Sequence, residues 1–160
     1  MTDLRTGRNG LELKIPPVAL GFLVAALMWS VGRATPNFDV TVPSTSIYAL
    51  ALALLGVAIC VSGVVSFRLA GTTVNPMSPG SSSSLVVTGV YRYTRNPMYL
   101  GILLILCAWA VYLSNLAALA FLPAFVFYMN RYQIEPEERA LASLFANEFS
   151  KYQAEVRRWV

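Results

Sequence analysis

The stretch MYLGILLILCAWAVYLSNLAALAFLPAFVFYM, Met98–Met129, is about 32 residues long and contains no charged side chain. A single helix of that length would reach roughly 48 Å, which is too long to cross a hydrocarbon core of ~30 Å without gross tilt. The polar pair Ser114-Asn115 divides the stretch into two apolar arms, 98–113 and 116–129. We therefore predict a tight helical hairpin with Ser114-Asn115 at its tip.

Two further apolar segments precede this hairpin. Ile15–Val31 contains no charge and begins with Pro16-Pro17, which a helix tolerates at its start, and Ile47–Phe67 is the clearest membrane span. A cleaved signal peptide is the competing interpretation of Ile15–Val31, but the chain that follows is just as apolar, which favours a retained span. The sequence predicts about four membrane segments, and the short arms of the hairpin leave its depth in the bilayer open.

The composition also indicates a membrane protein. Of the 160 residues, 56% are apolar and only 12% are charged, whereas a soluble domain carries about 25% charged residues. The length fits one membrane domain, 1–160. We expect an all-α, polytopic fold that adds a cytoplasmic loop and a C-terminal amphipathic helix to the apolar segments.

Charged residues orient the predicted segments. The connection between the second and third segments carries Arg68, Arg92 and Arg95 without an acid, while loop 32–46 has no net charge. Short loops on the cytoplasmic side of a membrane are enriched in Lys and Arg. Both termini and the regions 68–97 and 130–160 should therefore face the cytoplasm. We expect an integral membrane protein that is located in a bacterial inner membrane.

Composition excludes several classes of site. The chain has no histidine, which removes His-based triads and His-ligated metal sites, and we predict no metal. Cys60 and Cys107 lie inside apolar runs, where packing is the expected role. The net charge of +4 comes without a basic run interleaved with aromatics, so membrane lipids rather than nucleic acid are the expected partners.

Two polar regions contain the functional groups. The first, Gly71–Tyr99, is rich in glycine, proline and serine and enters the hairpin at Arg95-Asn96-Pro97. In the second, Arg131–Val160, Pro136 resembles the first residue of a new helix whose dipole Glu137 and Glu138 would complement. Leu141, Leu144, Phe145 and Phe149 recur at helical spacing and predict an amphipathic helix that lies on the membrane.

The blocks LVVTGVYRYTRNPMYLG (Leu85–Gly101) and EPEERALASLFANEFSKYQAEVRRW (Glu135–Trp159) flank the apolar hairpin. In order and spacing they resemble motifs of the membrane-embedded isoprenylcysteine carboxyl methyltransferase and phospholipid methyltransferase superfamily. The resemblance covers Gly71–Trp159 and implies S-adenosyl-L-methionine bound between the loop and the C-terminal helix. Carried over residue by residue, the implied cofactor contacts are Ser83, Ser84, Leu85, Val86, Tyr91, Asn96, Pro97, Met98, Tyr99 and Glu137.

Other roles at this site follow from charge and from position in the motifs. Arg95 could pair with the cofactor carboxylate, an inference from charge. Asn96 stands where eukaryotic members have histidine, and Gln133 where a substrate-contacting arginine would fall, so Arg131 and Gln133 are the substrate candidates. Glu137 and Glu138 are the candidate catalytic bases, although a carboxylate acceptor would need none.

The resulting expectation is a membrane methyltransferase that transfers methyl to a hydrophobic small-molecule or lipidated substrate, either an isoprenylcysteine-like carboxylate or a lipid amine. A membrane reductase of the steroid-reductase type, which would use NADPH, and a non-enzymatic membrane scaffold are the alternatives.

Overall fold

The computed structural model describes residues 12–41, 43–71 and 83–160, which form helices and no strand. The α-helices are α1 (Pro17–Ala34), α2 (Thr45–Leu69), α3 (Pro97–Leu113), α4 (Phe121–Tyr128) and α5 (Glu135–Glu155). Short 3-10 turns occur at Pro36–Phe38, Gly89–Arg92 and Ala117–Ala120, and a π-helical turn, Met129–Ile134, joins α4 to α5. The all-helical prediction is thus confirmed for the described ranges.

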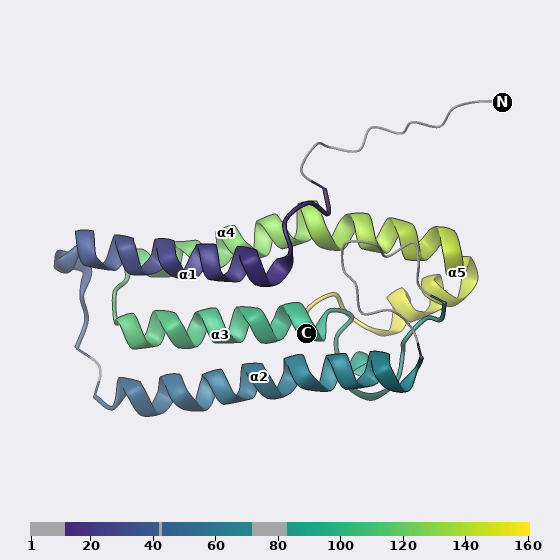
Figure 1. Cartoon of the computed structure of the whole chain (residues 1–160), viewed down its shortest axis with the longest axis horizontal. Coiled ribbons are helices and arrows are strands. Elements are labelled where there is room, and N and C mark those ends of the chain that lie inside the picture. Colours follow the sequence, from purple (N-terminus) through teal and green to yellow (C-terminus); the bar gives the residue numbers. More distant parts are fainter. Residues whose placement is uncertain (1–11, 42, 72–82) are drawn as a thin grey trace.

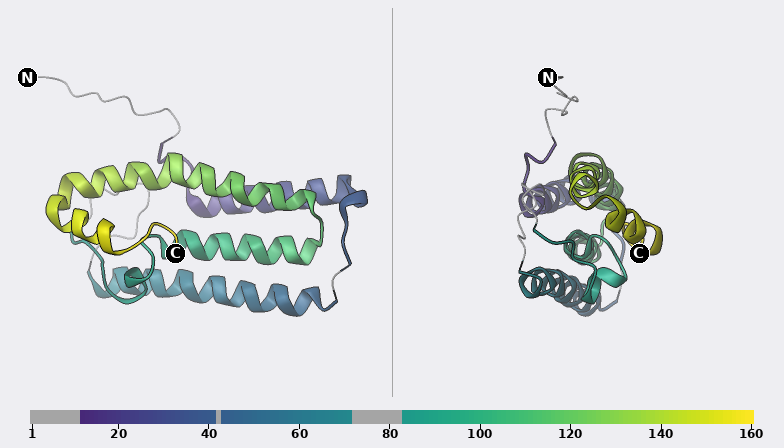
Figure 2. Two further views of the ribbon diagram at one scale, coloured as in Figure 1. Left: turned by 180° about the vertical axis from the view of Figure 1, so that it is seen from behind. Right: turned by 90° about the vertical axis from the view of Figure 1, so that its right-hand side faces the viewer.

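Helix α3 is the centre of the bundle. Seen end on, it lies between α2 and the pair formed by α1 and α4 (Figure 2). Glycines allow α2 and α3 to approach closely, since a Cβ atom on Gly101 would lie 2.5 Å from the carbonyl oxygen of Gly56 and would also strike Cys60 Sγ. The Cys60 thiol donates to the carbonyl of Met98 at 3.2 Å, so this cysteine is a packing contact, as predicted. Small residues at such crossings are typical of membrane helices.

The predicted hairpin turn is confirmed at Ser114-Asn115. α3 ends at Leu113, and Ser114 adopts a left-handed conformation with φ of 50°. Asn115, only 2% exposed, donates through Nδ2 to Asp39 Oδ1 at 2.8 Å and to the carbonyl of Thr35 at 2.9 Å. These hydrogen bonds hold the hairpin tip against the α1–α2 connection. We call this end of the bundle the far end. The returning arm begins as a 3-10 turn rather than as an α-helix.

Two helices, α1 and α2, are long and apolar enough to cross a membrane, and α3 is a shorter apolar helix. Large apolar side chains point outward from the first two, including Phe22 at 74% and Ile47 at 67% exposure. Water would disfavour such a surface, whereas hydrocarbon would not. The bundle is thus built as a membrane protein.

Helix α5 begins at Glu135 with Pro136 in its first turn, one residue before the predicted start, but this is not a free helix start. α4, the π-turn and α5 form one continuous helical rod, because the residues on both sides of each junction keep right-handed helical angles. Pro136 has no N–H to donate to the carbonyl of Tyr132. The backbone N–H of Leu13 donates to that carbonyl at 3.0 Å, so the chain ahead of α1 supplies the missing partner.

The C-terminal helix is not one straight amphipathic helix on the membrane. Ala146 has non-helical angles (φ 28°, ψ −101°), and after it α5 turns back along the bundle (Figure 1). Phe149 is buried in a cluster with Val86 and Tyr91, while Leu144 points outward with 45% exposure. Much of the apolar face therefore packs on the protein itself, which a helical-period pattern cannot distinguish from packing on lipid.

The close α2–α3 crossing predicts opposite effects of two Gly→Ala substitutions. Gly101→Ala should destabilise the protein by about 1–3 kcal/mol, because overpacking must push the helices apart. Gly32→Ala should be neutral or slightly stabilising, since its Cβ would meet no atom closer than 3.7 Å and alanine favours helix. Melting temperatures of both variants in the same detergent test this; equal melting temperatures would contradict it.

Candidate active site

A cleft opens at the end of the bundle where α2 ends, α3 begins and α5 folds back. Its enclosed volume is about 90 Å³, and its empty space including the open mouth is about 640 Å³. A ligand of nucleoside size would therefore use the mouth as well as the enclosed part. The lining residues are Phe67, Ser84, Leu85, Val86, Tyr91, Arg95, Asn96, Met98, Tyr99, Glu137, Glu138, Leu141, Phe149 and Tyr152.

The carboxyl group of Glu137 is the most unusual feature of this cleft. Its Oε1 accepts hydrogen bonds from Tyr99 Oη at 2.5 Å and from Gln133 Nε2 at 2.5 Å. Gln133 Nε2 also lies 3.4 Å from Tyr99 Oη, so the three side chains form one connected group from α3, the π-turn and α5. Gln133 and Glu137 are four residues apart, which places them on one face of the rod.

Burial raises the pKa of Glu137 to about 7, although the hydrogen bonds from Tyr99 and Gln133 favour the ionised form. A carboxyl group with such a pKa changes charge near neutral pH, so it can hold or release a proton there. The group is poised for acid–base chemistry or for pairing with a cation.

One wall of the cleft is aromatic. The ring of Phe67 meets Tyr91 edge-on with centroids 5.3 Å apart, and Tyr152 Oη donates to the carbonyl of Tyr91 at 2.7 Å. Burial raises the pKa of Tyr91 and of Tyr152 above the ordinary tyrosine range, so both hydroxyls stay neutral. With Phe149 these rings give an apolar surface suited to a flat ligand.

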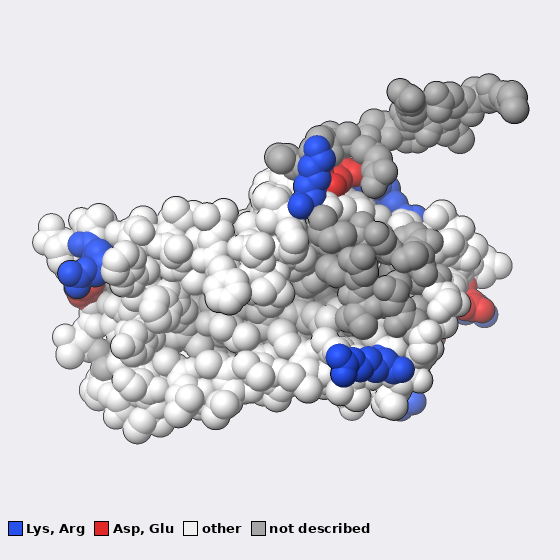
Figure 3. All heavy atoms as spheres, viewed as in Figure 1, with Lys and Arg blue, Asp and Glu red and all other residues white. Residues whose placement is uncertain are grey.

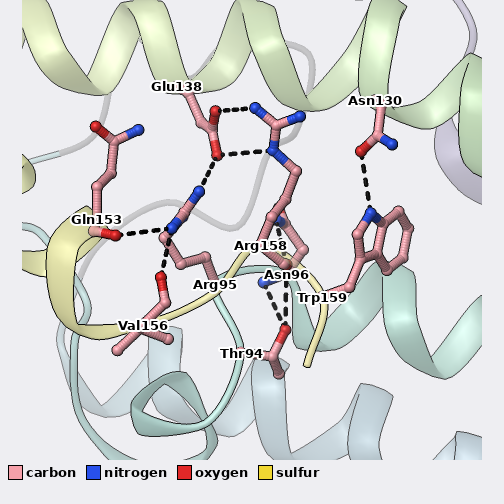
Figure 4. A network of polar contacts seen from close by, with 9 residues as sticks. All are labelled: Thr94, Arg95, Asn96, Asn130, Glu138, Gln153, Val156, Arg158 and Trp159. Carbon is pink, nitrogen blue, oxygen red and sulfur yellow. Dashed lines mark hydrogen bonds and ion pairs between the residues drawn. The ribbon is translucent and has the colours of Figure 1, made fainter.

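The opposite edge is held by ion pairs. Glu138 Oε1 lies 2.9 Å from Arg95 Nη2, and its Oε2 lies 2.6 Å from Arg158 Nη2 (Figure 4). Arg95 Nη1 also donates to the carbonyls of Gln153 and Val156. A bidentate pair between Arg95 and a ligand carboxylate would therefore have to displace Glu138. Arg95 Nε is buried and has no partner among the residues that the structure describes.

Hydrogen bonds fasten the chain end to the turn before α3. The carbonyl of Arg158 accepts from Asn96 Nδ2 at 2.9 Å and from Thr94 Oγ1 at 3.3 Å, and Trp159 Nε1 donates to Asn130 Oδ1 at 3.0 Å (Figure 4). We call residues 156–159 the C-terminal strap. Asn96 thus has a structural partner in addition to its place on the cleft wall.

The structure gathers most of the residues expected at the site. Ser84, Leu85, Val86, Tyr91, Arg95, Asn96, Met98, Tyr99 and Glu137 all line the cleft, as does Glu138. Ser83 and Pro97 are not among the lining residues. Gln133 is 2% exposed beside Tyr99, whereas Arg131 lies on the surface and pairs with Glu135 at 3.0 Å, away from the cleft.

Sequence reasoning missed part of the cleft wall. Phe67, Leu141, Phe149 and Tyr152 were not expected to contact a ligand, and all four line the cleft. The spacing of Leu141 and Phe149 does mark an inward helix face, but the fold-back at Ala146 that carries Phe149 to the cleft has no evident sequence signal. In the described part of the chain, no group of three His, Cys, Asp or Glu residues is placed to hold a metal ion.

Comparisons with known proteins agree with the motifs. The sequence model of the phospholipid methyltransferase family matches residues 44–148, a range that includes α2, α3, α4 and most of α5. An uncharacterized protein of Haemophilus influenzae is 43% identical over 63 residues, which are 39% of this chain and the whole of that protein. The family match spans well over half of the chain, and it includes Tyr99, Gln133, Glu137 and Glu138. The chain therefore belongs to the phospholipid methyltransferase family, within the superfamily that its sequence motifs resemble.

Proposed function

We propose that the protein is an S-adenosylmethionine-dependent methyltransferase of the membrane, acting on a lipophilic acceptor. The observation that supports this best is the enclosed carboxyl group of Glu137 beside an aromatic wall, in a chain of a methyltransferase family. The cofactor is cationic at its ammonium and sulfonium groups and carries a flat adenine. An ionisable acceptor beside aromatic side chains matches that chemistry.

The residues of the cleft suggest how the cofactor is held. Glu137 would accept hydrogen bonds from the ammonium or ribose groups, while Phe67 and Tyr91 would contact the adenine. Both Nη atoms of Arg95 are engaged and its Nε is buried, so the cofactor carboxylate would pair with Arg95 by displacing Glu138. When bound, S-adenosylmethionine supplies an electrophilic methyl group on its sulfonium. The protein residues orient it and exclude water.

The acceptor is either an isoprenylcysteine-like carboxylate or a lipid amine. A carboxylate is already ionised near neutral pH and needs only positioning. An amine must lose a proton, and Glu137 is then the better base, because Glu138 is held by Arg95 and Arg158. Gln133, next to Glu137, is the proposed polar contact of the substrate. Arg131 would contribute only if the acceptor extends to the outer surface of the rod.

The direct test is calorimetric titration of the purified protein with S-adenosylmethionine and, as a comparison ligand, NADPH. Methyl transfer from labelled S-adenosylmethionine to added lipids with carboxylate or amine groups then identifies the acceptor class. Binding of S-adenosylmethionine without NADPH supports the proposal. Binding of NADPH alone would favour a reductase, and binding of neither would favour a scaffold.

Affinity for S-adenosylmethionine should depend on pH through Glu137. Free Glu137 has a pKa of about 7, and a cationic ligand favours its ionised form, so binding below that pH must expel a proton. The affinity should fall by up to about tenfold per pH unit below 7 and level off above it. Titrations in buffers of different ionisation enthalpy count the released proton. Glu137→Gln is the matched control and should bind weakly with little pH dependence; a flat profile for the parent protein would contradict the assignment.

Replacing the two adjacent acids separately should give different defects. Glu137→Gln removes a charged acceptor, so affinity for S-adenosylmethionine should fall by about 10–100-fold with little loss of melting temperature. Glu138→Gln breaks two ion pairs that are mostly buried, so its melting temperature should fall clearly. Melting temperatures measured without ligand separate the two effects. Equal loss of affinity with unchanged stability in both variants would contradict this division.

We further propose that four segments cross the membrane, with both termini in the cytoplasm of a bacterial cell. In a variant with Cys60 and Cys107 replaced, a cysteine at position 37 should react with an impermeant reagent from outside, and one at position 151 should not. The Arg68, Arg92 and Arg95 side chains near the cleft are the reason for this orientation. Labelling at position 151 from outside would overturn it.

A further inference from the structure

A second cavity system lies in the half of the bundle away from the cleft. An apolar groove of about 620 Å³ runs between α1 and α2 over α3, with Gly21, Ala53 and Ile105 among its walls. Another cavity of about 640 Å³ lies at the far end. Trp109 and Tyr112 line both, so the apolar groove and the far-end cavity adjoin at these two rings.

The far-end cavity contains opposite charges. Arg33, from the last turn of α1, and Asp39, from the α1–α2 connection, both line it. They are the only charged residues in 15–67, and 96–130 has none. Figure 3 shows the same distribution: the middle of this face is white, and one blue group with red beside it marks the far end.

These two charges do not neutralise each other directly. Asp39 Oδ1 accepts from Asn115 Nδ2, and no ion pair joins Arg33 to any residue of the described ranges. Arg33 also complements the carbonyl end of α1, as basic residues do in a last turn. The N–H donors of the Arg33 guanidinium group therefore remain available to bind an anion.

Aromatic rings complete the cavity. Trp29, Trp109 and Tyr112 line it, and the rings of Trp109 and Tyr112 are stacked with centroids 5.4 Å apart. Trp109 Nε1 donates to the carbonyl of Ala25 at 3.0 Å, which fixes the ring where groove and cavity meet. Ring faces and a carboxylate together attract an ammonium group.

From this arrangement we infer that the far end binds one phospholipid with a zwitterionic headgroup, a phosphodiester joined to a primary ammonium. The guanidinium of Arg33 would take the phosphate, Asp39 and the rings would take the ammonium, and an acyl chain would fill the apolar groove. An anionic lipid would satisfy Arg33 but would place negative charge near Asp39. A plain hydrocarbon would use the groove and neither charge.

This lipid site is distinct from the site proposed for methyl transfer, whichever acceptor that site takes. The far-end cavity shares no lining residue with the cleft that contains Glu137, and the residues that line the two come from opposite ends of the bundle. A lipid there stabilises α1 against α2 and α3. The inference does not depend on the proposed methyl transfer, because its test measures binding without a methyl donor.

The test uses the delipidated full-length protein in detergent, titrated with dioctanoyl phosphatidylethanolamine or with dioctanoyl phosphatidylglycerol while the melting temperature is followed. The ethanolamine lipid should bind at least several-fold more tightly. Arg33→Gln and Asp39→Asn should each weaken its binding about tenfold, and Asp39→Asn keeps an oxygen for Asn115. Ala53→Phe, which fills the groove, should weaken both lipids. Arg68→Gln removes an exposed charge at the other end and is the matched control.

Three results would overturn the inference. Equal binding of the two lipids, unaffected by Asp39→Asn, would mean that Arg33 and the rings only anchor the bundle at the membrane surface. Preference for the glycerol lipid, lost only in Arg33→Gln, would indicate an anionic lipid. An equal loss in Arg68→Gln would show that the effect is general charge and not this cavity.

Discussion

The carboxylate of Glu138 ties together the parts of the chain that form the cleft. Its two ion pairs join α5 to Arg95, in the turn before α3, and to Arg158, in the C-terminal strap, with only 14% of the Glu138 side chain exposed. A mostly buried ion pair adds little net stability compared with apolar packing, but removing one partner is costly because a charge is left uncompensated. The pairs therefore act mainly to fix which segments meet. With the strap in place, the turn is closed against α5 and the cleft has a defined edge.

The two adjacent acids on α5 have different hydrogen-bond partners. Residues 137 and 138 are separated by about 100° around the helix, so they point to different neighbours. Glu138 meets two arginines, whereas Glu137 meets Tyr99 and Gln133 and is enclosed. Burial without a cation explains the raised pKa of Glu137, and because the helix continues from the π-turn, neither acid lies at a free helix start. Position in the bundle, and not residue type, therefore gives these two acids different surroundings.

The sequence was enough to predict the apolar segments, the turn at Ser114-Asn115 and most of the cleft wall. These features depend on local signals: length without charge, a polar pair in an apolar run, and motifs of fixed spacing. It was not enough to predict the continuity of α4 and α5 or the bend at Ala146, because both depend on partners far away in the chain. Pro136 does lie in the first turn of α5, as proline often does, but nothing local to it indicates that the π-turn continues the helix from α4. Phe149 and Tyr152 were missed for the same reason, since the bend decides what they face.

The contact at Pro136 also explains how the chain ahead of α1 can influence the cleft. Leu13 donates to the carbonyl that Pro136 leaves unpaired, and Glu12, nearly buried, pairs with Arg139 at 2.8 Å. These contacts fall on the rod at Tyr132 and Arg139, on either side of Glu137 in the sequence. A π-turn is a less stable arrangement than a regular helix and persists where tertiary contacts favour it. This π-turn sets the register that brings the side chains of Gln133 and Glu137 to the hydroxyl of Tyr99. The N-terminal segment therefore supports the geometry of the Glu137 carboxyl group without contacting it.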